Sequence, residues 1–347
     1  MRRALVVVTV VGLLVLGGCI GGTGVEDGAD QDEDEGVANE GVETEGELEI
    51  HHIDVGQADA TLLITPDGET VLIDTGDWRN DGRDVIEYLE ARGVDRIDHL
   101  VATHAHADHI GGHAAVIEHF EERGEGVGAA YDSGVVHTSA TFDDYLDAVE
   151  EHDVGLFQVE DGDDLPLEDG IVDATVLNPP EGDPGDEIDD NGVALVAEFG
   201  SFSYLTTGDA GRDAERRLVD DRSGALEADA YQAGHHGSST SSIEPFLEAA
   251  DPQVAIVSSA GNSQYGHPHD EALERFADRE IETYWTAVHG DVVLTTDGEE
   301  TTVTAERDAS TDPMDLLEKK YDEERASPGE PAASHPSIDP ARAPLSG

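Results

Sequence analysis

Cysteine, positive charge and long apolar runs are scarce in this sequence. One residue in 347 is a cysteine, Cys19, which argues against a structural zinc held by thiolates. Only 18 residues are Lys or Arg against 80 Asp or Glu, and the net charge is −62. The carboxylates are spread along the chain, so an acidic protein specialised in binding cations or histone-like partners is the less favoured interpretation. Because concentrated salt screens such self-repulsion, the composition indicates a halophilic, archaeal source.

The N-terminus carries the only long apolar run, residues 4–16, which is too short to span a bilayer comfortably. Arg2 and Arg3 precede it, and two glycines and Cys19 follow it. This pattern predicts a lipoprotein-type signal peptide over residues 1–19, with the lipid on Cys19 and the paired arginines suited to twin-arginine export. We therefore expect an exported cell-surface lipoprotein held at the membrane surface, where one lipid chain needs further contacts. The alternative is that Cys19 is an ordinary buried residue.

The rest of the chain divides into three parts by composition. Residues 20–46 are Gly, Asp and Glu with almost no large apolar side chain, so they predict a disordered tether. Residues 308–347 predict a flexible, loosely attached tail with one short helix over 313–325. The body, residues 47–307, has the apolar content for a core and is expected to form one domain.

Within the body, short β-rich runs alternate with amphipathic helices. Runs at 48–55, 60–65 and 70–74 predict a strand meander, and a helix over 84–92 ends at a glycine. Later strands and helices alternate as far as residue 305. This order predicts an α/β fold with two sheets and helices outside, an αββα four-layer sandwich. Loops from the strand ends would then meet at one edge, where a site is usually built.

Four potential metal ligands stand within six residues, directly after a predicted strand: His104, His106, Asp108 and His109. A loop can turn alternate side chains toward two neighbouring points, so the spacing predicts two adjacent metal positions rather than one helix face. Imidazole and carboxylate ligands suit zinc, manganese or iron. A solvated histidine-rich loop is the alternative.

The run THAHADHIGG, residues 103–112, resembles the signature loop of the metallo-β-lactamase superfamily. Five further segments resemble family motifs in the same order. The first and the last two of these segments resemble the DNA-uptake branch, the C-terminal hydrolase domain of the competence protein ComEC. The segments are IDVGQADATLLIT (53–65), LIDTG (72–76), YLTTGDA (204–210), AGHHGSSTSS (233–242) and YGHPHD (265–270). The resemblance extends over residues 48–304.

The resemblance implies a site with two divalent metal ions, zinc or manganese. Its ligands would be His104 and His106 on the first metal, Asp108 and His109 on the second, Asp209 as the bridge, and His235 or His236 completing the second. Asp74 would orient the histidine loop. Family members commonly have a further histidine 18 to 25 residues before the bridging aspartate, and this chain has none there. We expect Asn191 or a water to fill that position.

The resemblance also implies catalysis by a metal-activated hydroxide, with Asp108 orienting it and His267 or His269 at the edge of the site donating to a substrate oxygen. The branch implies a phosphodiester substrate, and we expect this to be extracellular DNA. Gln232 and Ser239 stand where related uptake nucleases often have cations, which weakens that expectation. Two alternatives remain open: a small-molecule hydrolase for an ester, lactone or β-lactam, and a non-catalytic component of a DNA-uptake apparatus.

Overall fold

The structure is a computed structural model that describes residues 46–168, 170–182 and 185–326. The predicted signal peptide, the lipid-bearing Cys19 and nearly all of the predicted tether lie outside these residues. Among the residues described, no helix is both long and apolar enough to cross a membrane.

Two β-sheets form the centre of the described domain. The first has eight strands in the order β14-β13-β1-β2-β3-β4-β5-β6, and the second has six in the order β12-β11-β10-β9-β8-β7. The strands of the first sheet are β1 (Leu48–His52), β2 (Thr61–Ile64), β3 (Thr70–Ile73), β4 (Ile97–Val101), β5 (Val127–Asp132), β6 (Gly155–Gln158), β13 (Val292–Thr296) and β14 (Thr301–Ala305). Those of the second are β7 (Val172–Asn178), β8 (Ala194–Phe199), β9 (Phe202–Thr206), β10 (Ala230–Gln232), β11 (Val254–Val257) and β12 (Glu282–Trp285).

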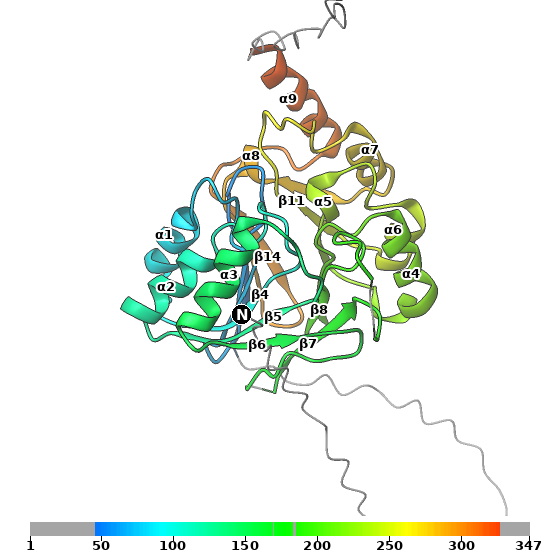
Figure 1. Cartoon of the computed structure of the whole chain (residues 1–347). Helices are drawn as coiled ribbons and strands as arrows, with labels where there is room; N and C mark the ends of the chain where they lie inside the picture. The colour runs from blue at the N-terminus through cyan, green and yellow to red at the C-terminus, as the bar shows by residue number, and fades with distance from the viewer. Residues whose placement is uncertain (1–45, 169, 183–184, 327–347) are drawn as a thin grey trace, which may run out of the picture. The chain divides into compact units, whose positions relative to one another are not determined.

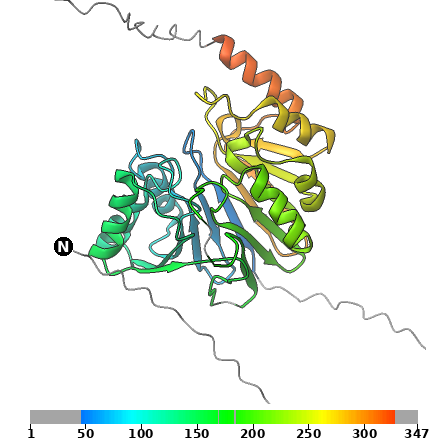
Figure 2. The same ribbon diagram turned by 45° about the vertical axis from the view of Figure 1, so that its right-hand side comes forward.

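Helices cover the outer face of each sheet (Figures 1 and 2). Over the first sheet lie α1 (Arg83–Arg92), α2 (His113–Arg123) and α3 (Ala140–Glu151). Over the second lie α4 (Arg212–Arg222), α6 (Glu244–Ala250), α7 (Asp270–Asp278) and α9 (Pro313–Ala326). The short segments η1 (Ser223–Ala225), α5 (Gly234–Gly237) and α8 (Thr286–His289) complete the fold.

Alternation of side chains along the strands separates three apolar cores. On neighbouring positions of β2, Leu62 packs under the helices of the first sheet, while Leu63 packs between the two sheets. Tyr204 and Leu205 divide in the same way on β9, toward the inner core and the helices of the second sheet. Because successive residues of a strand point to opposite faces, each sheet is apolar on both sides. The predicted αββα sandwich is confirmed.

The chain order of the strands brings polar loops to one edge. Strands β3 to β6 pair in parallel, as do β9 to β12. The carboxyl ends of parallel strands share one edge, so the loops after β3, β4, β9, β10 and β11 meet there. These loops contain most of the residues that the sequence singles out.

The sequence pattern does not predict β5 and β6. Every residue of β6 is exposed, which leaves no apolar alternation to read. Strand β5 contains Gly128 and two alanines, which have low strand propensity. Both extend the parallel part of the first sheet.

The described part of the C-terminal segment is not loosely attached, in contrast to the expectation for residues 308–347. Helix α9 packs against α7, and its Leu316 is 1% exposed within the core of the second sheet. Lys320 Nζ donates to the carbonyl of Pro268 and to the carboxylate of Asp270, both at 2.8 Å. Apolar side chains of this helix therefore belong to the core of the second sheet.

Candidate metal centre

The histidine-rich loop, residues 103–112, connects β4 to α2 and is held from below by Asp74. Asp74 follows β3, is 1% exposed and has a φ of 58°. It accepts hydrogen bonds from Thr103 N (2.9 Å) and Thr103 Oγ1 (2.6 Å), and its Oδ2 lies 2.7 Å from His109 Nδ1. This carboxylate therefore fixes both the start of the loop and the orientation of the His109 ring.

Two glycines allow the loop to pack closely on the segment after β3. A β-carbon on Gly111 would collide with the backbone of Trp78 and Ala107, and one on Gly112 with the backbone of Gly82 and Thr75. The loop is pinned to that segment by Trp78 N, which donates to Ala107 O at 3.0 Å. The glycines thus bring the histidine loop against residues 75–82.

Asp209 lies at the centre of the cluster. It follows β9 and is 3% exposed. Its Oδ1 lies 3.3 Å from His109 Nε2 and 3.8 Å from His236 Nε2. Its Oδ2 lies 3.8 Å from His104 Nε2 and 3.5 Å from His235 Nε2. The two oxygens of one carboxylate therefore face two different sets of imidazoles.

The cluster separates into two groups of potential ligands that share Asp209. One group is Asp59, His109, Asp209 and His236, and the other is His104, His106, Asp189 and Asp209. Within each group the ligand atoms all lie within 4.8 Å of one another. Asp108 adjoins the first group, with its Oδ2 3.4 Å from His236 Nε2. A shared carboxylate between two ligand sets is the arrangement expected of a two-metal site.

Several polar atoms in these groups are buried without a hydrogen bond among the described residues. They are His109 Nε2, His236 Nε2, Asp209 Oδ1, Asp59 Oδ1 and Asp189 Oδ1. Buried polar atoms are normally satisfied, so a concentration of unsatisfied ones at a single point needs a partner. Imidazole nitrogens and carboxylate oxygens converging on one point suit a cation, and the residues present fit divalent metal ions.

The electrostatics of the cluster also favour a bound cation. Burial alone would raise the pKa of the Asp209 carboxyl, but the charges of His109 and His236 lower it well below its usual range. Burial alone would lower the pKa of His109, but Asp209 and Asp74 raise it well above its usual range. The carboxylates therefore draw positive charge into a buried space, which protons or metal cations can supply.

The adjacent histidines after β10 adopt an unusual backbone conformation. His235 and His236 have φ values of 53° and 56°, in the left-handed region that non-glycine residues rarely adopt. His236 is 2% exposed and belongs to the buried ligand group, whereas the His235 side chain is 29% exposed. Of the two alternatives left open by the sequence, His236 is the one enclosed with His109.

In the loop before β8, Asp189 rather than Asn191 lies against the histidines. Asp189 Oδ1 is 3.1 Å from His106 Nδ1 and 3.8 Å from His104 Nε2. The Asn191 side-chain amide donates instead to the carbonyl of Glu187 at 2.8 Å. The structure thus places a carboxylate where the sequence led us to expect Asn191 or a water.

The two histidines after β11 lie in different surroundings. His267 is 6% exposed, and its ring centroid lies 6.0 Å from that of His236 and 5.7 Å from that of His235. Burial and the neighbouring histidines lower its pKa to about 3. His269 accepts from Ser239 N at 2.9 Å and donates to Tyr265 O at 3.1 Å. Both ring nitrogens of His269 are thus hydrogen-bonded to backbone atoms. This favours a structural role in the loop over donation to a substrate.

Sequence reasoning missed Asp59, Asp189 and His137. Asp59 is 3% exposed and its carboxylate oxygens lie 3.5 Å from His236 Nδ1 and 3.9 Å from His109 Nδ1. Its position inside the segment IDVGQADATLLIT was the available signal. The His137 ring lies 5.8 Å from that of His106, and nothing in its local sequence indicates this.

Comparison with known proteins gives a family and several related proteins. Residues 53–261 match the family model described as the metallo-beta-lactamase superfamily. The chain is 30% identical over 265 residues to ComE operon protein 3 of Bacillus subtilis (strain 168), covering 72% of this chain and 33% of that protein. It is 31% identical over 248 residues to Competence protein ComA of Neisseria gonorrhoeae, covering 71% and 32%. Among solved structures, CmlA, a diiron beta-hydroxylase from Streptomyces venezuelae, has a TM-score of 0.49 at 16% identity, covering 73% of this chain and 55% of that one.

An αββα sandwich with a buried cluster of histidines and carboxylates at one sheet edge defines a metal-binding domain. The family match shows which one: the chain belongs to the metallo-β-lactamase superfamily. The resemblance to the DNA-uptake branch is confirmed by the identity to ComE operon protein 3 and ComA. The chain spans about a third of the length of these two relatives.

Proposed function

We propose that this chain is an exported, two-metal phosphodiesterase that hydrolyses extracellular DNA. The observation that carries the proposal is Asp209, whose two carboxylate oxygens face two separate sets of potential ligands. A carboxylate shared by two ligand groups would hold two cations close to each other, as two-metal hydrolysis requires.

The first metal would be held by His104, His106, Asp189 and Asp209. The second would be held by His109, His236 and Asp209, with Asp108 and Asp59 as the nearest further carboxylates. A carboxylate in place of a third histidine makes the first site richer in oxygen. Carboxylate ligands suit manganese better than they suit zinc, so we expect manganese to support activity at least as well as zinc.

Two bound cations would supply a water of lowered pKa and neutralise charge on the phosphoryl oxygens. The chain's own residues supply the rest. Asp74 holds the His109 ring through its Nδ1, which leaves Nε2 directed at Asp209. His267, kept neutral by burial, lies beside His236 and can donate to or accept from a substrate oxygen.

The names of the related competence proteins support a substrate connected with DNA uptake. Gln232 stands where related uptake nucleases often have a cation, which argued against DNA as the substrate. In the structure this argument is weaker, because the Gln232 side chain is buried and accepts hydrogen bonds from Thr61 and Tyr204. It occupies a core position, not one that grips phosphate. The carbonyl of Ser239 accepts from Arg212 and Arg275, so two cations already stand beside that loop.

The proposal is tested by incubating the full chain, loaded with manganese or zinc in concentrated salt, with plasmid DNA, single-stranded DNA and a chromogenic ester. We expect the wild type to release nucleotides. His106→Ala and Asp108→Ala should each lose both nucleotide release and metal binding. His119→Gln is the matched control, because His119 lies on α2 and contacts Glu90 and Arg123 instead of the metal ligands, and this variant should retain both. Turnover of the ester alone would favour the small-molecule hydrolase, and turnover of neither substrate would favour the non-catalytic uptake component.

A further inference from the structure

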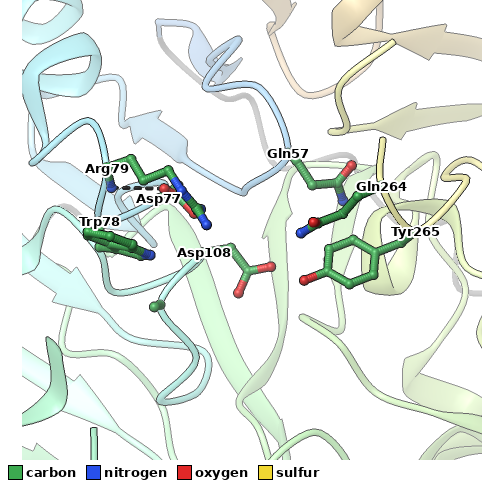
Figure 3. A pocket seen from close by; sticks show the side chains of 8 residues that line it. Gln57, Asp77, Trp78, Arg79, Asp108, Gln264 and Tyr265 are labelled. Atoms are coloured by element: carbon green, nitrogen blue, oxygen red, sulfur yellow. Dashed lines mark hydrogen bonds and ion pairs between the residues drawn. The ribbon is translucent and has the colours of Figure 1, made fainter. Parts of the chain in front are cut away.

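A cavity of about 170 Å³ opens beside the candidate metal centre. In Figure 3, Asp77, Trp78 and Arg79 lie on one side of it, Gln57, Gln264 and Tyr265 lie on the other, and Asp108 lies between the two groups. The volume is far above the 10 to 15 Å³ or so that one water needs. A substrate group can therefore occupy the cavity while another part of the same molecule reaches Asp108.

The two aromatic side chains of this cavity are unusually exposed. Trp78 is 53% and Tyr265 57% exposed, more than any other aromatic in the described part of the chain. In a sequence with 5% aromatic residues, the two most exposed rings of the described residues thus line the same cavity. Rings on opposite walls offer flat apolar faces to a flat ligand.

Both rings are attached to segments that also position the metal centre. Trp78 is tied to the histidine loop through its hydrogen bond to Ala107 O, and the Tyr265 ring lies 5.7 Å from that of His267. These two contacts place the rings beside the loop that contains Asp108 and beside His267. A ligand held between them would present its neighbouring atoms to the metal ligands.

Polar groups around the rings fit a nucleotide. Gln57 Oε1 is buried without a hydrogen bond among the described residues and can accept from a base or sugar. The Arg79 guanidinium lies 4.9 Å from the Trp78 ring centroid and pairs with Asp77 at 2.8 Å. Arg79 also lines a second, adjoining cavity of about 400 Å³ together with Arg83. Two arginines beside the site stand out in a chain with 18 basic residues against 80 acidic ones.

We propose that the cavity between Trp78 and Tyr265 is a slot for one base of a single-stranded nucleic acid, with the adjoining arginines beside its backbone. The inference rests on the proposed phosphodiesterase function and names its substrate as single-stranded. Stacking suits the solvent, because concentrated salt screens phosphate contacts and leaves aromatic contacts intact. Every base offers such a face, so the slot selects for an unpaired strand and not for sequence.

The slot is tested first by tryptophan fluorescence. The chain has two tryptophans, and Trp285 is fully buried, so a ligand at the slot changes the emission of Trp78. Oligodeoxyadenylate mixed rapidly with the metal-loaded full chain should quench emission, and Trp78→Phe should abolish the quenching. Equal quenching by oligoriboadenylate would assign the slot to both sugars, and quenching by the deoxy form alone would assign it to DNA. Absence of quenching by either would overturn the proposal.

The second test compares two phosphodiesters with the same leaving group, thymidine 5′-(p-nitrophenyl phosphate) and methyl p-nitrophenyl phosphate. Trp78→Ala and Tyr265→Ala should each reduce the preference in kcat/KM for the base-bearing substrate about 5- to 150-fold. Phe157→Ala, at an exposed aromatic on β6, is the matched control and should retain the preference. An unchanged preference, or an equal loss on both substrates, would overturn the slot. If the wild type hydrolyses neither, the proposed function fails and fluorescence alone decides the slot.

Discussion

Replacing Asp74 by Asn should weaken metal binding without touching a proposed ligand. An amide of the same shape can still accept from Thr103 N, but its NH₂ group would then face Thr103 Oγ1 and His109 Nδ1 in place of a carboxylate oxygen. His109 Nδ1–H loses its acceptor, and the proton is favoured on Nε2, the nitrogen that faces Asp209. Loss of such an orienting partner costs about 10- to 100-fold in metal affinity.

Calorimetric titration of the metal-free full chain with manganese in concentrated salt measures this effect. Asp98→Asn is the matched control, because Asp98 lies on β4, the strand that leads into the histidine loop, and accepts from Thr70 and Arg96 instead of from that loop. The reasoning predicts weaker binding in Asp74→Asn and unchanged binding in Asp98→Asn. Equal metal affinity in Asp74→Asn and the wild type, with both folded by circular dichroism, would refute it.

Three further outcomes follow from the described residues and the N-terminal sequence. Leu316→Ala, at a side chain 1% exposed in the core, should lower the free energy of unfolding by about 2 to 5 kcal/mol in thermal or chemical denaturation. A decrease near zero would instead support a loosely attached C-terminal segment. Burial lowers the pKa of His52 from 6.5 to about 3, so its contribution to stability is present above pH 6.5 and is lost as the pH falls toward 3. The loss is up to about 5 kcal/mol, and His52→Gln should flatten this part of a pH–stability curve. Cys19→Ser should move the protein from the membrane fraction to the medium. An unchanged distribution would contradict the predicted lipid anchor on Cys19.

The fold and most of the cluster could be predicted from local patterns. The histidine loop stands in one short run, and period-two alternation in β1 to β3 and β7 to β9 fixes which residues enter the cores. Asp209 comes three residues after the end of an apolar strand, as a loop residue at a sheet edge should. These features depend on residues that are close together in the sequence, so a short stretch of sequence is enough to predict them.

The remaining features depend on contacts between distant segments. Asp189 and Asn191 are equally plausible in sequence, and only the path of the loop turns Asp189 toward His106. Asp59 enters the cluster because the loop after β1 packs beside His236, and Trp78 enters the cavity because Gly111 allows a close backbone approach. No local pattern encodes such packing.

Metal content of the purified holoenzyme tests the central claim most directly. Inductively coupled plasma mass spectrometry of the full chain, saturated with manganese and then freed of excess metal, should find two ions per chain in the wild type. Asp189→Ala should retain one, in the group of His109 and His236, and Asp209→Ala should lose both or bind them weakly, while His119→Gln should retain two. One ion per chain in the wild type, or two ions retained in Asp209→Ala, would contradict a two-metal centre bridged by Asp209.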